Sequence, residues 1–305
     1  METRRAADVP PYEFHFVAVP ADLEPYLNSL YTWRTNVPFL DDVLPAYSGQ
    51  LVSFVSGQGM LCPAGGDEYP TSDAFIVAPL LAAIPFVIDG PALAFGVSLN
   101  FRGWAALTGF DVAACNDRMF PAAEGIAPHL AERLAMLAGQ LRDGEIDEQA
   151  MLDAMAQIVR EGIRPLPDKH RLVIDRTLEW LSASFSPEIA VLNANLPYSE
   201  RQVQRLVARF FGQTPMRLSR RYRAVRAATL LSLPDIDQAL EVEIRDALYD
   251  QAHMIKEIRH FTGRTPRRLL PAAGSVVSEM LGPDGYGVVD LFGGNQDQQL
   301  GREPR

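Results

Sequence analysis

The chain has 305 residues and a net charge of −10, and its 48% hydrophobic and 22% charged residues are typical of a globular protein of about two domains. The two cysteines, Cys62 and Cys115, exclude a disulfide framework and a CxxC metal site and favour a reducing compartment. The first residues lack the apolar core of a signal peptide, and no run of about 18 apolar residues occurs. We therefore expect a cytoplasmic protein with no membrane partner.

The N-terminal part, residues 1–120, is predicted to be rich in β-strands. Tyr12, Phe14 and Phe16 alternate with polar residues, as in a strand with one buried face. Similar short apolar runs, separated by Gly, Pro and Asp, follow at 51–55, 75–80, 84–88 and 93–99. Short strands at this spacing predict a sandwich or a small barrel.

The pattern changes to helix from Pro121 onward. Apolar residues recur with helical spacing in 127–141 and 148–159, and Pro167 and Asp168 favour a further helix start. The last residues are rich in Gly, Asp and Gln without sustained periodicity. We expect an α+β multidomain protein with four parts: a β-rich domain at 1–120, a helical linker at 121–165, an all-α domain at 166–271 and a flexible tail at 272–305.

The all-α domain contains an internal repeat. The segment FFGQTPMRL at 210–218 recurs 51 positions later as FTGRTPRRL at 261–269, with Phe, Gly, Thr, Pro, Arg and Leu at matching places. Six identities within nine residues exceed what a chance match between helices supplies. Two copies are too few for a solenoid, which needs about three repeats. The sequence therefore predicts two copies of one helical unit.

Charge is divided unequally along the chain. Residues 199–270 hold 14 basic and 8 acidic residues, a balance of +6 that leaves −16 for the rest of the chain. Nearly all of these basic residues are Arg, whose planar guanidinium suits bidentate contacts with phosphate and guanine. A solvated charged face is the alternative interpretation. The separation favours a phosphate-binding domain fused to an acidic partner.

Each copy of the repeat is predicted to end the second helix of a helix-turn-helix unit. In the first unit, Ser186 and Pro187 are expected to begin a supporting helix, and Ser199 to cap the next one with Gln202. The apolar face of that second helix consists of Val203, Leu206, Val207 and Phe210. Its outward positions are Arg201, Gln204, Arg205 and Ala208. Arg and Gln in this place bond base edges in a major groove.

The second unit is predicted to be built in the same way. Its supporting helix is expected at 236–245, and Asp250 is expected to cap the second helix. The inward positions are Met254, Ile258 and Phe261. The outward positions are Gln251, His253, Lys256 and Arg259. His253 and His260 have no third metal ligand nearby, so we expect His253 to contact DNA and no metal to bind.

A helix at 215–231 is expected to connect the two units. Arginines of this connector and of the second repeat are expected to bind phosphates: Arg217, Arg220, Arg221, Arg223, Arg267 and Arg268.

The segments SERQVQRLVARFFGQTPMRL and YDQAHMIKEIRHFTGRTPRRL resemble the C-terminal DNA-binding domain of AraC/XylS-type bacterial transcription regulators. The resemblance covers about 170–270 and implies that two recognition helices enter successive major grooves about 34 Å apart. It places Arg201, Gln204 and Arg205 at base-contacting positions of the first helix. It places Gln251, His253 and Lys256 at exposed positions of the second. The chain departs from the family where Pro197 and Ala247 replace turn glycines and Glu243 replaces a small residue.

The resemblance also implies an N-terminal domain that senses a small molecule or mediates dimerisation. Residues 93–109 (LAFGVSLNFRGWAALTG) resemble the last strand and first helix of one such sensor domain. The aromatic candidates for lining a ligand pocket are Tyr31, Trp33, Phe54, Phe101 and Trp104. The alternative is that these rings only fill the core of a small β domain.

Enzyme interpretations find little support in the sequence. A metal-binding cupin needs clustered histidines, but the β-rich region contains only His15. The glycine-rich stretch Ser56–Gly59 lacks the Lys of a phosphate-binding loop. No Ser-His-Asp arrangement can be nominated, and no cofactor is expected.

The sequence thus predicts a sequence-specific DNA-binding transcription regulator, not an enzyme, that is modulated through its N-terminal domain. The expected partners are double-stranded DNA, a small-molecule effector, a second copy in a homodimer and, for an activator, RNA polymerase. The expected location is the bacterial cytoplasm, on the nucleoid. One alternative is a ligand-responsive interaction protein whose helical domain has lost DNA binding, which Pro197, Ala247 and Glu243 favour. Another is an enzyme with a DNA-binding appendage, which requires a catalytic or metal cluster in 1–165.

Overall fold

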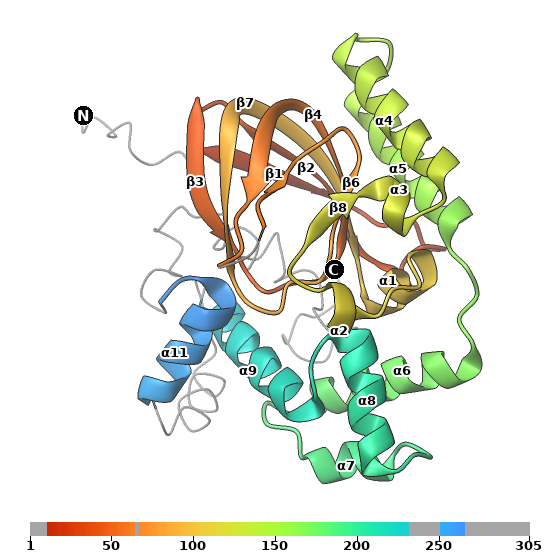
Figure 1. The fold of residues 1–305 in the computed structure, drawn as a ribbon, viewed down its shortest axis with the longest axis vertical. Coiled ribbons are helices and arrows are strands. Elements are labelled where there is room, and N and C mark those ends of the chain that lie inside the picture. The colour runs from red at the N-terminus through yellow and green to blue at the C-terminus, as the bar shows by residue number, and fades with distance from the viewer. Residues whose placement is uncertain (1–10, 65–66, 232–250, 266–305) are drawn as a thin grey trace, which may run out of the picture.

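The computed structural model describes residues 11–64, 67–231 and 251–265. An antiparallel sheet forms the N-terminal part, two helices lie beside it, and further helices lie below it (Figure 1). The expected α+β fold class, with a β-rich N-terminal domain followed by helices, is confirmed.

The sheet contains eight strands within the described residues. Their bounds are β1 (Tyr12–Val17), β2 (Leu27–Thr35), β3 (Phe39–Leu44), β4 (Gln50–Leu61), β5 (Tyr69–Pro70), β6 (Phe75–Val77), β7 (Ile84–Leu99) and β8 (Met119–Pro121). The strand order is β1-β2-β7-β4-β6-β8, while β3 pairs with β7 and β5 with β4. The long strand β7 pairs with β3 through its first half, with β2 through its second half, and with β4 along its other edge. β7 therefore holds the sheet together.

Each predicted strand overlaps a strand of the observed sheet, but the bounds differ and β2, β3, β5 and β8 are not predicted. The separate runs expected at 84–88 and 93–99 belong to the single strand β7. Strands β2 and β3 are not predicted from the sequence, because Asn28, Arg34 and Asp42 interrupt their apolar residues. Strand pairing with β7 stabilises both segments in spite of these polar positions.

Both faces of the sheet are buried, because apolar residues occupy successive positions of its central strands. On one face, Leu51 and Phe95 pack against α1 (Phe101–Leu107), α4 (Pro128–Arg142) and α5 (Glu148–Gly162). The opposite face is a second core, and its members include residues of the C-terminal helices. The helices predicted as a linker at 121–165 therefore share a core with the sheet.

All of the C-terminal helices but the last contribute to a third apolar core, and the buried residues of the last belong to the core on the sheet. The bounds of these helices are α6 (Asp168–Ser182), α7 (Ile189–Ala194), α8 (Glu200–Phe211), α9 (Pro215–Leu231) and α11 (Gln251–Thr262). Two short helices, α2 (Val112–Cys115) and α3 (Ala122–Gly125), lie earlier in the chain. The connecting helix expected at 215–231 is confirmed as α9. The expected Ser186 cap is wrong, because α7 begins only at Ile189 and Glu188 is its N-cap residue.

Several predicted features lie outside the described residues. They are the supporting helix at 236–245, Glu243, Ala247, Asp250, Arg267, Arg268 and the tail. Within the described ranges, no helix has the length and apolar character needed to cross a lipid bilayer.

Candidate nucleic-acid interface and ligand cavity

Helix α8, the first of the two predicted recognition helices, has the capped start and the apolar face that the sequence predicts. Ser199 is its N-cap residue, and the Gln202 side chain accepts a hydrogen bond from the Ser199 backbone N–H at 3.0 Å. Val203, Val207 and Phe210 are buried. This face fixes the helix on the domain and leaves the opposite side free to meet a partner.

The three predicted base-contacting residues of α8 lie together on its exposed side. Arg201, Gln204 and Arg205 are all exposed. Their contact with bases stays a prediction, since the structure contains no nucleic acid. The exposed side of α8 therefore presents two guanidinium groups and one amide to solvent.

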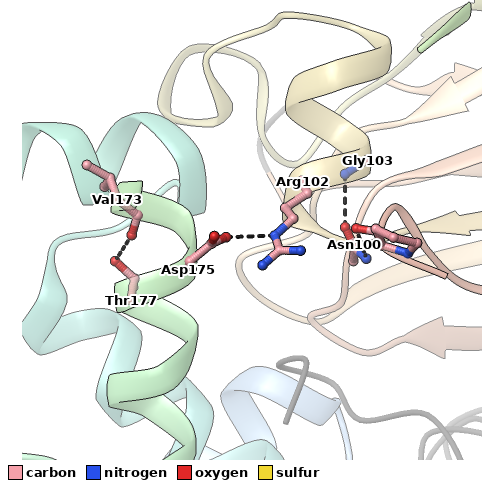
Figure 2. Close-up of polar contacts among 7 residues, drawn as sticks. Asn100, Arg102, Gly103, Val173, Asp175 and Thr177 are labelled. Carbon is pink, nitrogen blue, oxygen red and sulfur yellow. Dashed lines mark hydrogen bonds and ion pairs between the residues drawn. The ribbon is translucent and has the colours of Figure 1, made fainter. Parts of the chain in front are cut away.

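The first unit is attached to the end of the β-rich domain through α1. The rings of Phe101 and Phe211 have centroids 4.3 Å apart, which joins α1 to α8. Arg102 of α1 donates to Asp175 of α6 at 2.7 Å (Figure 2). These contacts hold α6 and α8 against the helix that directly follows β7.

The same view shows how the two partners of this ion pair are positioned. Asn100 accepts from the backbone N–H of Gly103 at 2.9 Å and caps α1, the helix that carries Arg102 (Figure 2). Buried Thr177 donates its hydroxyl proton to the Val173 carbonyl at 2.7 Å inside α6. Both helices are thus locally stabilised around the contact.

A basic recess lies between α6 and α8 and was not predicted from the sequence. Its side chains are Lys169, His170, Tyr198, Gln202, Arg205, Leu206 and Arg209. Burial lowers the pKa of His170, and the neighbouring charges of Arg209 and Lys169 lower it further. The cations come from two helices more than thirty positions apart, so the only sequence signal is the general excess of Arg. The recess extends the positive surface of α8 towards α6.

Helix α11, the second predicted recognition helix, also has the predicted inward face. Met254, Ile258 and Phe261 are buried, whereas Lys256 and Arg259 are exposed. The side chains of Gln251 and His253 lie outside the described residues.

A buried carboxylate joins α11 to the connecting helix α9. Glu257 is buried, and Arg220 donates to it at 2.5 Å. The Arg223 guanidinium lies 3.9 Å from the other carboxylate oxygen. Arg220 and Arg223, which the sequence assigned to phosphates, therefore have an intramolecular carboxylate partner in this conformation. The pairing offsets the cost of burying the Glu257 charge.

Arg221 requires a correction to the predicted phosphate contacts. Its side chain is buried, and burial lowers its pKa to about 10, which the nearby Asp117 carboxylate partly offsets. A buried guanidinium cannot contact the phosphates of a DNA duplex bound at the surface. Arg217, by contrast, is exposed on α9. Arg217 and Arg221 lie one turn apart on the same side of α9, so the difference in burial comes from what packs over each turn and not from the direction of the side chains.

The second unit also contacts the β-rich domain. The backbone N–H of Ala46 donates to the Phe261 carbonyl at 2.6 Å, and that of Ala83 donates to the His260 carbonyl at 2.9 Å. Arg264 forms an ion pair with Asp42 of β3. The C-terminal end of α11 is thus bonded to two loops and one strand of the sheet.

An apolar cavity of about 120 Å³ lies on the sheet face opposite α4 and α5. Tyr31, Trp33 and Phe54, three of the predicted pocket residues, are among those that line it. Phe101 and Trp104 do not line it and correct the prediction. Trp104 packs in the core beneath α4 and α5, and Phe101 packs in the core of the first unit.

Residues of several strands, together with Tyr47 and Thr71 of the loops, supply the rest of the cavity wall. The other lining residues are Phe14, Phe16, Ser29, Leu44, Tyr47, Gln50, Val52, Met60, Leu61, Thr71, Phe75, Val77, Phe86, Ile88, Ala94, Ser98 and Met119. Leu44 belongs to β3, the strand that also carries Asp42. The cavity wall and the contact with the second unit therefore share one strand.

No protein-family model matches the chain, and no curated protein matches it. Among solved structures, it is similar to ToxT from Vibrio cholerae O395, with 8% identity and a TM-score of 0.46 over 86% of this chain and 98% of that one. ToxT bound to an unsaturated fatty acid gives 7% identity and a TM-score of 0.40, covering 76% and 94% of the chains. The AraC-like transcriptional activator CuxR gives 14% identity and a TM-score of 0.32, covering 80% and 87%. Similarity at this level assigns no activity.

Proposed function

We propose that the protein is a sequence-specific DNA-binding transcription regulator with two recognition helices. The observation that supports this most strongly is the matched construction of α8 and α11. Each helix buries one apolar face and exposes basic residues on the other: Arg201 and Arg205 on α8, and Lys256 and Arg259 on α11. Helices built in this way dock in the major groove of duplex DNA.

In this proposal, Arg201, Gln204 and Arg205 contact bases. Gln251, His253 and Lys256 do so from the second helix. Phosphate contacts come from Arg217 and Arg259, which are exposed, and from Arg267 and Arg268 of the second repeat. Lys169 and Arg209 of the basic recess add to them. Arg221 is left out because it is buried.

The β-rich domain is proposed to modulate DNA binding, through a small molecule in its cavity or through dimerisation. The supporting observation is the direct contact between the second unit and the sheet, through Ala46, Ala83 and the Asp42–Arg264 ion pair. A shift of β3 changes the position of α11 relative to α8. RNA polymerase is a further partner if the protein activates transcription, and the bacterial cytoplasm is the proposed location.

Mobility shifts at increasing salt test the electrostatic part of the proposal. About six phosphate contacts predict that log K falls with log salt at a slope of about −5. A response that is flat with salt would contradict the proposal.

The second candidate is an interaction protein that no longer binds DNA specifically. The observation that favours it is the intramolecular pairing of Arg220 with Glu257 and of Arg264 with Asp42, which occupies cations of the helical domain. Mobility shifts with cognate and random duplexes at one salt concentration separate the two candidates, because this one predicts equal, weak binding to all duplexes.

A further inference from the structure

The residues that line the cavity of the β-rich domain favour uncharged ligands over charged ones. Most of its lining is aromatic or aliphatic, and no charged side chain lines it within the residues described. Placing a charged group in such surroundings is costly without an opposite charge or several hydrogen bonds. The two tyrosines of the wall, Tyr31 and Tyr47, remain neutral, because burial raises the pKa of both phenols. An anionic or cationic ligand therefore has no counter-charge here.

Three polar residues of the lining, Ser29, Gln50 and Ser98, are neighbours across three paired strands of the sheet. Ser98 is held in a network of side chains: its hydroxyl oxygen accepts from Asn28 at 3.2 Å and from Gln50 at 2.9 Å. The same oxygen lies 3.1 Å from the hydroxyl of Ser48, to which it can donate. The hydrogen-bonding capacity of Ser98 is thus taken up within the protein.

The orientation of the Gln50 amide follows from its neighbours. Its Nε2 lies 3.3 Å from the Ser48 carbonyl oxygen, which can only accept, so this atom of the amide must be the nitrogen. The carbonyl oxygen Oε1 is then the second atom of the amide. Oε1 is buried and meets no donor in the described part of the chain. Gln50 itself is almost fully buried.

Gln50 Oε1 is a buried acceptor without a donor in the ranges that the structure describes, and Gln50 lines the cavity, so we infer that a bound ligand supplies the missing hydrogen-bond donor. Buried polar atoms are almost always hydrogen-bonded, and those that are not require an explanation. Almost none of the Oε1 surface is accessible, so the amide must turn towards the cavity that Gln50 lines before a ligand can donate to it. Such a hydrogen bond satisfies the amide, and the apolar body of the ligand fills the cavity. An apolar cavity of about 150 Å³ holds a benzene ring, so the volume of about 120 Å³ fits a single ring or a short branched chain.

We propose that this cavity binds a small uncharged molecule that consists of an apolar body and one hydroxyl or N–H group donating to Gln50. The inference deepens the proposed function, since this ligand is the effector of the regulator. The described lining supplies no counter-charge for a carboxylate, so carboxylates are disfavoured.

Three matched probes test the inference by calorimetry on the full chain. They share one ring: 4-methylphenol has a donor, 4-methylanisole has an oxygen without a donor, and 4-methylbenzoate is charged. We expect 4-methylphenol to bind about tenfold or more tightly than 4-methylanisole, because only it satisfies the buried acceptor. We expect no binding of 4-methylbenzoate. Equal affinities, preference for the benzoate, or no binding of any probe would overturn the inference.

Variants assign the effect to the cavity. Gln50→Leu removes the acceptor and should abolish the preference for 4-methylphenol, while Gln140→Leu on α4 serves as the matched control and should keep it. Because Gln50→Leu also loosens the Ser98 network, Ala94→Trp provides a second variant that fills the cavity from β7. It should abolish binding of all probes, and unchanged binding would place the site elsewhere and contradict the inference.

The outcome is separable from that of the proposed function. Footprinting without any probe measures DNA binding alone. A protein that binds 4-methylphenol but protects no DNA leaves the ligand site standing and removes the regulator. A protein that protects DNA but binds no probe keeps the proposed regulator and removes the ligand site.

Discussion

Arg264, in the second copy of the repeat, forms an ion pair with Asp42 of β3, 222 residues earlier in the chain. Asp42 is buried and Arg264 is half-buried, so the pair is largely removed from water. Leu44, two residues after Asp42, lines the ligand cavity. The second recognition helix is therefore bonded to a strand whose other residues form the wall of the cavity.

Breaking this pair should free the second unit. We expect Asp42→Asn to destabilise the α11 contact by about 3 kcal/mol, because it leaves a guanidinium near the interior without its partner. Hydrogen exchange should then accelerate at amides 254–263 and stay unchanged in α8. Asp41→Asn, at the neighbouring exposed position, is the control and should change neither. Equal acceleration in both recognition helices would show that the pair is not specific to the second unit.

The glycine that precedes Arg264 should be equally important. Gly263 has φ +71°, and a Cβ there would lie 2.3 Å from Cγ1 of Val43 in β3. Gly263→Ala therefore combines the cost of the left-handed conformation with a clash, and should lose about 3 kcal/mol or more in urea unfolding. Gly109→Ala is the matched control, because Gly109 has φ +70° and no atom within 4 Å of its Cβ position among the described neighbours. It should lose only about 1–2 kcal/mol. Equal losses would contradict the close packing against β3.

Arg205 should contribute to sequence preference. Arg205→Ala is expected to weaken binding to the cognate site by about 1–3 kcal/mol and to relax specificity, because a guanidinium that bonds a base edge discriminates between bases. Competition mobility shifts with cognate and random duplexes measure both effects. Arg171→Ala, at an exposed position of α6, is the control. If both duplexes weaken equally, Arg205 contacts phosphate only.

Two arginines of α9 should behave in opposite ways. Arg217→Ala is expected to reduce the salt slope of DNA binding by about 1 with little change in stability, because Arg217 is exposed. Arg221→Ala should leave the salt slope unchanged and lower the free energy of unfolding by about 3 kcal/mol, since it empties a buried position and leaves Asp117 without its neighbour. A reduced slope for Arg221→Ala would show that the DNA-bound conformation exposes this residue.

His170 should make the first unit sensitive to acid. Burial lowers its pKa in the folded state from the ordinary value of 6.5, so the unfolded chain binds the proton more readily. Stability contributed by neutral His170 is present above pH 6.5 and is lost as the pH falls through this value towards the lower folded pKa. His170→Gln should remove this part of the pH dependence in urea unfolding, while His129→Gln, at an exposed position of α4, should keep it. An unchanged profile for His170→Gln would contradict the assignment.

Local patterns predicted the helical part of the fold well. Ser199, Gln202 and the apolar spacing of α8 lie within one helix, so the sequence alone contains the information that forms it. The start of α9 follows for the same reason, because Pro215 stands at the first position of the helix, where proline is favoured.

Features that depend on tertiary contacts could not be predicted in this way. Arg221 is one of many arginines in the sequence, and only the packing of α9 near Asp117 buries it. The polar part of the cavity lining is similar: Gln50 and Ser98 come from strands that pair directly across the sheet but lie 48 positions apart in sequence. Phe101 and Trp104 resemble pocket residues by type, yet the turn from β7 into α1 carries them into other cores.

Footprinting of the purified protein on the DNA upstream of its own gene tests the central claim most directly. Two recognition helices on one face of the duplex predict two protected patches separated by one helical turn, about 10 base pairs, with Arg205→Ala weakening one patch. DNA with no protected patch at protein concentrations that saturate non-specific binding would contradict the account.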